Sequence, residues 1–186
     1  MTLKILKKAF SNNQIACIYS NASDTTRFSV GYLIKADEND TLIAQVSPQG
    51  RYDGYIVKKT AEIFLIETGD RYSKKIETLF LKSPQRHLLK MENLDMNECD
   101  SILFSVLKYA FENELIVSIQ LCNSGFQDIT GFVKEMNAEN VCIQNVDDFG
   151  NPNGEAYFLL GDVTNCEVDS EELSLIKNLF RMDIAF

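Results

Sequence analysis

Apolar residues follow a helical spacing at both ends of two long segments and a strand-like spacing between those ends. Leu3, Leu6 and Phe10 recur at intervals of three and four residues, and so do Phe104, Leu107 and Phe111. This spacing gives a helix one apolar face, so each segment is expected to begin with a short helix. Residues 71–80 and 170–180 return to the same spacing and predict a closing helix for each segment.

Between these helices, short runs rich in β-branched and aromatic residues predict five strands per segment. The expected strands are 15–19, 28–36, 41–46, 54–60 and 62–67 in the first segment, and 115–121, 128–136, 141–146, 155–160 and 162–168 in the second.

The two segments match each other without a gap when residues 31–80 are laid on residues 131–180. Identical residues meet at Gly31, Ile43, Val46, Gly50, Gly54, Glu67, Ile76, Leu79 and Phe80. An ungapped match over this length indicates a tandem duplication. We therefore expect a first domain over 1–82, a linker over 83–100 and a second domain over 101–186.

The matched glycines indicate where the chain bends. Pro48 and Gly50 suit a bend between two strands, and the pairs Asp53-Gly54 and Asn153-Gly154 suit a tight turn with positive φ; Gly150 repeats the role of Gly50. Gly31 and Gly131 interrupt the second strand of each copy, where a missing side chain permits a sharp bend. The predicted fold is mainly β with short helices: two tandem five-stranded barrels, each with an N-terminal and a C-terminal helix.

A short helix followed by five bent strands resembles the Sm-like family of small barrels, which are similar to SH3-like barrels. The resemblance implies an RNA site built from Asp and Asn after the second strand and from basic residues between the fourth and fifth strands. Here those positions hold Asn39 with Asp37 and Asp40, and Lys58 with Lys59. In the second copy Asn137 and Asn140 remain, but Phe158 and Leu159 replace the lysines. The resemblance also implies that edge strands pair subunits with one another.

Charge divides the chain into unequal halves. Residues 1–90 hold 14 basic and 9 acidic residues, a net charge of +5, whereas residues 91–186 hold 4 basic and 18 acidic residues, a net charge of −14. A strongly acidic half repels phosphate backbones, so we expect no DNA partner, and any RNA partner would bind the first barrel. The acidic half also serves solubility or attracts a basic protein surface.

Composition points to a soluble, cytoplasmic protein with no membrane partner. No apolar run approaches the roughly 20 residues that cross a bilayer, and no cleavable signal pattern follows the first residues. The five cysteines form no CxxC pair and are interpreted as buried free thiols; they are Cys17, Cys99, Cys122, Cys142 and Cys166. The single histidine, His87, has no obvious partner.

No residue pattern indicates catalysis, a cofactor or a metal. No serine, cysteine or carboxylate stands in an activating context, and no phosphate-binding glycine loop follows a strand. The carboxylates of 37–40 lack calcium-loop spacing and are interpreted as turn residues. Within 91–100, Asp95 or Asn97 is expected to cap the next helix.

These observations favour a non-catalytic binding or assembly module whose partner is a protein or a second copy of the chain. The alternative is RNA binding through Asn39, Arg51, Tyr52, Lys58 and Lys59, with the Tyr52 ring as a base-stacking surface. A third possibility, an enzyme, requires a pocket with perturbed titratable groups. The helical and strand periodicity places Leu6, Phe10, Leu33, Ile43, Leu79, Phe80 and their equivalents in the core.

Overall fold

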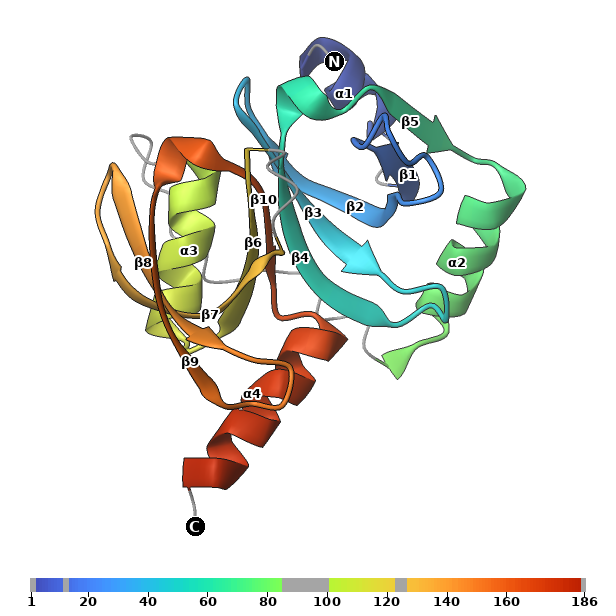
Figure 1. Ribbon diagram of the computed structural model, residues 1–186. Coiled ribbons are helices and arrows are strands. Elements are labelled where there is room, and N and C mark those ends of the chain that lie inside the picture. The colour runs from blue at the N-terminus through green and yellow to red at the C-terminus, as the bar shows by residue number, and fades with distance from the viewer. Residues whose placement is uncertain (1–2, 12–13, 85–100, 123–126, 185–186) are drawn as a thin grey trace. The chain divides into compact units, whose positions relative to one another are not determined.

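The structure is a computed structural model that describes residues 3–11, 14–84, 101–122 and 127–184, in the last case without the side chains of residues 183 and 184 (Figure 1). The chain divides into two compact units, Met1–Asn93 and Leu94–Phe186. Most of the expected linker lies outside the described residues, as do His87, Asp95, Asn97 and Cys99. Among the described residues, no helix is long and apolar enough to cross a membrane.

The first unit contains two helices, five strands and one turn of 3-10 helix. In chain order these are α1 (Leu3–Ala9), β1 (Ala16–Tyr19), β2 (Ser29–Ala36), β3 (Asp40–Val46), β4 (Tyr52–Lys59), η1 (Thr60–Glu62), β5 (Leu65–Thr68) and α2 (Arg71–Leu81).

The second unit repeats this order. Its elements are α3 (Ile102–Glu112), β6 (Ile116–Leu121), β7 (Ile129–Met136), β8 (Asn140–Val146), β9 (Pro152–Leu159), η3 (Leu160–Asp162), β10 (Val163–Val168) and α4 (Glu171–Ile184). All ten predicted strands and the four predicted helices are therefore present, with bounds close to those expected.

The prediction of two closed five-stranded barrels is wrong. The strands form an open antiparallel sheet, in the order β5-β1-β2-β3-β4 in the first unit and β10-β6-β7-β8-β9 in the second. Among the described residues, β4 does not pair with β5, and β9 does not pair with β10. The hydrophobic periodicity that predicts strands carries no information on whether the two outer strands meet, which explains the error. The coarser expectation, mainly β with short helices, is confirmed.

The register of the strands repeats between the units at an offset of one hundred residues. β2 pairs with β3 through a shift between Leu33 and Lys35, and β7 pairs with β8 through a shift between Val133 and Glu135. Such shifts are β-bulges, which bend a strand and increase its twist. Both units therefore place the bulge at the same point of the same strand.

Gly31 and Gly131 allow neighbouring strands to approach closely, two residues before these bulges. A Cβ atom added at Gly31 would lie 2.1 Å from the backbone oxygen of Ala44, and one added at Gly131 would lie 2.0 Å from that of Gln144. No side chain fits in either place. Both glycines thus lie in the strands where bending was expected, and the close approach of the next strand excludes a larger residue.

Gly50 closes the β3–β4 turn, as expected. Its φ is +72°, and its N–H donates to the Ser47 carbonyl oxygen at 2.8 Å. A Cβ atom at Gly50 would lie 2.3 Å from the Cβ atom of Leu79, so α2 packs directly on this turn. Gly150, with φ +85°, meets α4 in the same way.

Gly54 and Gly154 also have positive φ, of +76° and +78°, but neither lies in a turn. They lie inside β4 and β9, beside register shifts that follow Ala44 and Gln144 in the partner strands. The expected tight turn at Asp53-Gly54 and Asn153-Gly154 is therefore a bulge within a strand.

Side chains of the first unit pack on both faces of its sheet, in two separate clusters. One cluster joins α1 to alternate strand residues and consists of Leu6, Phe10, Ala16, Ile18, Ile43, Ile56 and Ile63. The other joins α2 to the opposite face and consists of Ile15, Cys17, Val30, Tyr32, Val46, Ile76 and Phe80. Because successive strand residues point to opposite faces, β1 contributes to both clusters.

The second unit has a smaller cluster beneath α4, formed by Ile116, Val146, Leu173 and Ile176. Its first helix, α3, contacts β6, β7 and β10, and Figure 1 shows it lying across these strands. The expected core residues Leu6, Phe10, Ile43 and Phe80 are buried. Leu33 is only partly buried, and the expectation is wrong for Leu79, Leu179 and Phe111, which are 40%, 42% and 49% exposed.

Candidate functional site

The residues expected to bind RNA lie at opposite ends of the β3–β4 hairpin. Asp40 pairs with Lys59 at one end of the ladder, and Val46 pairs with Tyr52 at the other. At about 3.3 Å per residue, the seven steps from Tyr52 to Lys59 span about 23 Å. Lys58, Lys59 and Asn39 therefore share one end, and Arg51 and Tyr52 do not join them.

Carboxylates surround the lysine pair at its end of the hairpin. The Lys59 ammonium donates to Asp40 Oδ1 at 2.9 Å, and Asp40 is only 1% exposed. Lys58 is itself buried. Burial raises the pKa of Glu62, whereas the positive charges of Lys58 and Lys59 act in the opposite direction. The Lys59–Asp40 ion pair and the nearby Glu62 carboxylate offset the positive charge that a phosphate would need.

The expected Asp and Asn residues of the β2–β3 turn hold the backbone in place. Asp37 Oδ1 accepts hydrogen bonds from the N–H groups of Asn39 and Asp40 at 2.8 and 2.7 Å, and the Asn39 carbonyl accepts one from Thr60 N–H at 2.9 Å. In the second unit, Asn137 accepts two such bonds. Side chains of this type stabilise turns by bonding to the following backbone. Among the described residues, no group of three potential metal ligands is present here or elsewhere.

At the other end of the hairpin, Tyr52 is half-buried and packs against the core. Its ring lies edge-on to Tyr55, with centroids 5.5 Å apart, and packs against the α2-side cluster. Arg51 is exposed, and its N–H donates to Ser47 Oγ at 3.2 Å. A ring packed in this way offers less surface to a base than the sequence suggested.

Among the described residues, no cysteine forms a disulfide bond, and none forms part of a metal-ligand group. Cys17, Cys142 and Cys166 are buried, as expected, whereas Cys122 is exposed. Burial, followed by the nearby carboxylates of Asp70 and Glu67, raises the pKa of Cys17 to about 12. An activated thiol requires the opposite shift.

An exposed edge strand, β9, is the feature that the sequence did not reveal. β9 pairs only with β8, so its other side carries unpaired backbone N–H and C=O groups among the described residues. Its large side chains are also exposed: Tyr157 is 72% exposed and Leu159 is 53% exposed. At the matching positions of β4, Val57 is 2% exposed and Lys59 is half-buried.

Polar contacts fix the orientation of side chains on the exposed face of β9. Glu155 accepts a hydrogen bond from the Lys134 ammonium and another from Tyr157 OH, the latter at 2.6 Å. These contacts lower the pKa of Glu155, chiefly through the bond from Lys134. The Tyr157 ring is thus held at the surface.

The first unit also has an edge strand, β5, which pairs only with β1. Leu65 is 41% exposed, and the adjacent Phe64 is 45% exposed. α1 contacts β5 and carries three exposed lysines, Lys4, Lys7 and Lys8. The β5 edge therefore combines apolar residues with the acidic Glu67, and the lysines of α1 lie beside it.

Comparison of the chain with protein-family models, with curated proteins and with solved structures finds no match. The Sm-like resemblance accordingly stays a prediction from the sequence, and the site must be interpreted from its own geometry.

Proposed function

We propose that this protein is a non-catalytic assembly module in which the β9 edge of one copy pairs with the β5 edge of another. The observation that carries the proposal is the exposure of β9, an edge strand with Tyr157 and Leu159 at its surface. Exposed, apolar strand edges readily pair with another strand, and most proteins protect them with charge or with a covering segment.

Charge favours β5 as the partner strand. The half of the chain that contains β9 has a net charge of −14, and the half that contains β5 has a net charge of +5. The lysines of α1 lie beside β5, so an antiparallel or parallel β9–β5 pair brings opposite charges together. Complementary charge selects the partner and its orientation. Unlike a two-fold contact, this head-to-tail contact builds rings or filaments.

The test is the mass of the full-length protein as a function of concentration, measured by analytical ultracentrifugation. We expect a concentration-dependent oligomer that weakens at high salt. The double variant Tyr157→Lys, Leu159→Lys places charge on the edge and should give a monomer. Leu175→Lys is the matched control, because Leu175 is 60% exposed on α4 of the same unit.

A wild-type protein that stays monomeric at high concentration would refute self-assembly. Loss of the oligomer in the Leu175→Lys variant, with the β9 variant unaffected, would move the interface from β9 to α4.

A further inference from the structure

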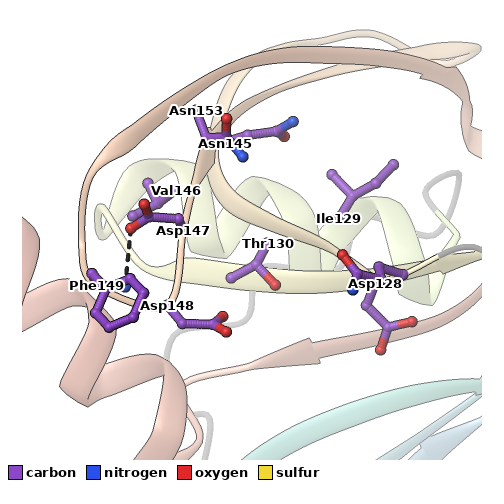
Figure 2. A pocket seen from close by; sticks show the side chains of 10 residues that line it. Asp128, Ile129, Thr130, Asn145, Val146, Asp147, Asp148, Phe149 and Asn153 are labelled. Atoms are coloured by element: carbon purple, nitrogen blue, oxygen red, sulfur yellow. Dashed lines mark hydrogen bonds between the residues drawn. The ribbon is translucent and has the colours of Figure 1, made fainter.

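The second unit contains a pocket of about 390 Å³ between the start of β7 and the β8–β9 turn. Figure 2 shows Asp147, Asp148 and Phe149 on one side of it and Asp128 on the other. Pockets of this size accommodate small ligands or a single long side chain. The ten lining residues are Gln127, Asp128, Ile129, Thr130, Asn145, Val146, Asp147, Asp148, Phe149 and Asn153.

In the first unit, Phe28, the residue that matches Asp128, lies in an aromatic cluster. Phe28 stacks on Tyr19 with ring centroids 4.9 Å apart and meets Tyr72 edge-on at 5.7 Å. At the offset of one hundred residues, Asp128 takes the place of Phe28, and Glu172 takes that of Tyr72. The second unit thus has carboxylates where the first has a packed aromatic cluster.

A second replacement adds to this difference in polarity between the two units. Val30 belongs to the α2-side core of the first unit, whereas Thr130 lines the pocket of the second. Replacing a core of aromatic and branched residues by smaller polar ones normally destabilises a fold. The pocket is therefore a feature that packing does not explain.

The lining is acidic and contains no basic residue. Asp128 is exposed, and partial desolvation of its carboxylate raises its pKa. Asp147 differs, since its carboxylate accepts hydrogen bonds from the N–H groups of Asn151 and Phe149, which lower its pKa. Asp147 shapes the turn, and Asp128 and Asp148 supply the negative charge.

Two of the uncharged lining residues, Asn145 and Phe149, offer further contacts. The side-chain oxygen of Asn145 is shielded from solvent and accepts no hydrogen bond from any described residue. A buried oxygen in this state gains free energy when a donor reaches it. Phe149 is 77% exposed at the rim, where its ring can lie against a cation.

We propose that this pocket binds a guanidinium group. A guanidinium is planar, always positively charged, and presents five N–H donors, so it can bond to carboxylates and an amide oxygen together while its face stacks on an aromatic ring. An ammonium is a compact point charge without a stacking face, and it matches this lining less well. The site shares Asn153 with β9 but does not include Tyr157 or Leu159, the residues proposed for assembly.

The guanidinium can belong to an arginine side chain of a polypeptide or to a free small molecule, and two probes separate these sources. Methylguanidinium carries the group alone, and the blocked tripeptide Gly-Arg-Gly carries it on a peptide. The blocked tripeptide Gly-Lys-Gly is the control, because it carries a positive charge without a planar guanidinium group.

The experiment is a titration of full-length, isotope-labelled protein followed by NMR. We expect methylguanidinium and the arginine peptide to shift the backbone amides of residues 128–130 and 145–149 at millimolar concentration, and to bind several-fold more tightly than the lysine peptide. Tighter binding of the arginine peptide than of methylguanidinium identifies a polypeptide ligand, and equal affinity identifies recognition of the group alone.

Three variants test the residues. Asp128→Asn keeps the shape of the side chain and removes its charge, and should weaken binding about tenfold, the equivalent of about 1.4 kcal/mol. Asp128→Phe installs the residue of the first unit and should abolish binding by filling the pocket. Glu139→Gln removes an exposed charge outside the pocket and should leave the affinity unchanged.

Asp148→Asn gives a second measure of the charge if Asp128→Phe does not fold. The proposal is overturned if neither guanidinium probe shifts these amides, if the lysine peptide binds equally well, or if Asp128→Asn and Glu139→Gln behave alike.

Discussion

Backbone contact, rather than side-chain chemistry, decides the identity of several matched residues. Gly31 and Gly131 lie against the carbonyl of the next strand, and Gly50 and Gly150 lie against the following helix. Leu79 matches Leu179 for a related reason: its Cβ atom packs on Gly50, although much of its side chain is exposed.

Replacing Gly31 by alanine tests this account. The new Cβ atom would overlap the Ala44 carbonyl, so β2 must move away from β3, and overpacking of this kind destabilises a protein by about 1–3 kcal/mol. We expect a lower midpoint of urea unfolding, measured by circular dichroism. Gly161→Ala is the control, because no atom lies within 4 Å of the added Cβ. Equal midpoints for the two variants would contradict the close-approach explanation.

Single residues also show what the sequence does not reveal about the expected RNA site. The sequence displayed Lys58 and Lys59 as a basic pair, but only the strand register brings Asp40 opposite Lys59. Burial of that carboxylate, at 1% exposure, likewise follows from packing that a linear pattern does not contain.

Strands and helices were the most predictable features. The alternation of residues 15–18 between two core clusters follows directly from the side-chain period of a strand, so the bounds of β1 agree to within one residue. Closure into barrels could not be predicted, because it depends on whether β4 reaches β5 and not on either strand alone. The exposure of β9 was equally hidden, since its sequence is as apolar as that of a buried strand.

The closing helices begin with different capping residues, although their positions match. Asp70 Oδ1 accepts hydrogen bonds from the N–H groups of Tyr72 and Ser73 at 2.6 and 3.0 Å. These bonds lower the pKa of Asp70, and the bond from the Ser73 N–H has the largest effect. Ser170 Oγ accepts one from Leu173 N–H at 3.3 Å. Only the first of these caps carries a charge that can titrate.

This difference predicts that the cap of α2 is sensitive to acid. Because the folded-state pKa of Asp70 lies below its unfolded value of about 3.9, its stabilisation is complete at neutral pH and is lost as the pH falls through the folded pKa. At pH 7, Asp70→Ala should lower the stability by about 1 kcal/mol, and Asp70→Ser, which copies the second unit, should lose less.

The measurement is thermal unfolding at pH 7 and at pH 3. The difference between wild type and Asp70→Ser should shrink or change sign at the lower pH. A difference that stays the same at both pH values would show that the Asp70 charge does not contribute to the cap.

At the scale of the whole molecule, negative and positive charge are divided between the two halves of the chain. The half with a net charge of −14 contains both the exposed β9 edge and the acidic pocket, and the half with +5 contains the lysines of α1. The comparison of matched positions gave the one sequence signal for the pocket, the replacement of Phe28 by Asp128. That signal became interpretable only when the structure showed that Phe28 fills an aromatic cluster.

The same charge distribution predicts that the full-length protein does not bind single-stranded RNA. Its net charge is −9, the Lys59 ammonium is bonded to Asp40, Lys58 is buried, and the half-buried Tyr52 packs against the core. Phosphate binding needs accessible positive charge, and base stacking needs an accessible ring. We therefore expect no change in the polarisation of a fluorescein-labelled oligouridine at low salt. The double variant Lys58→Glu, Lys59→Glu is the control. RNA binding through the first unit would be shown if the wild type bound RNA with an affinity that falls steeply with salt. The variant would then lower the slope of log affinity against log salt concentration by about one for each lost phosphate contact.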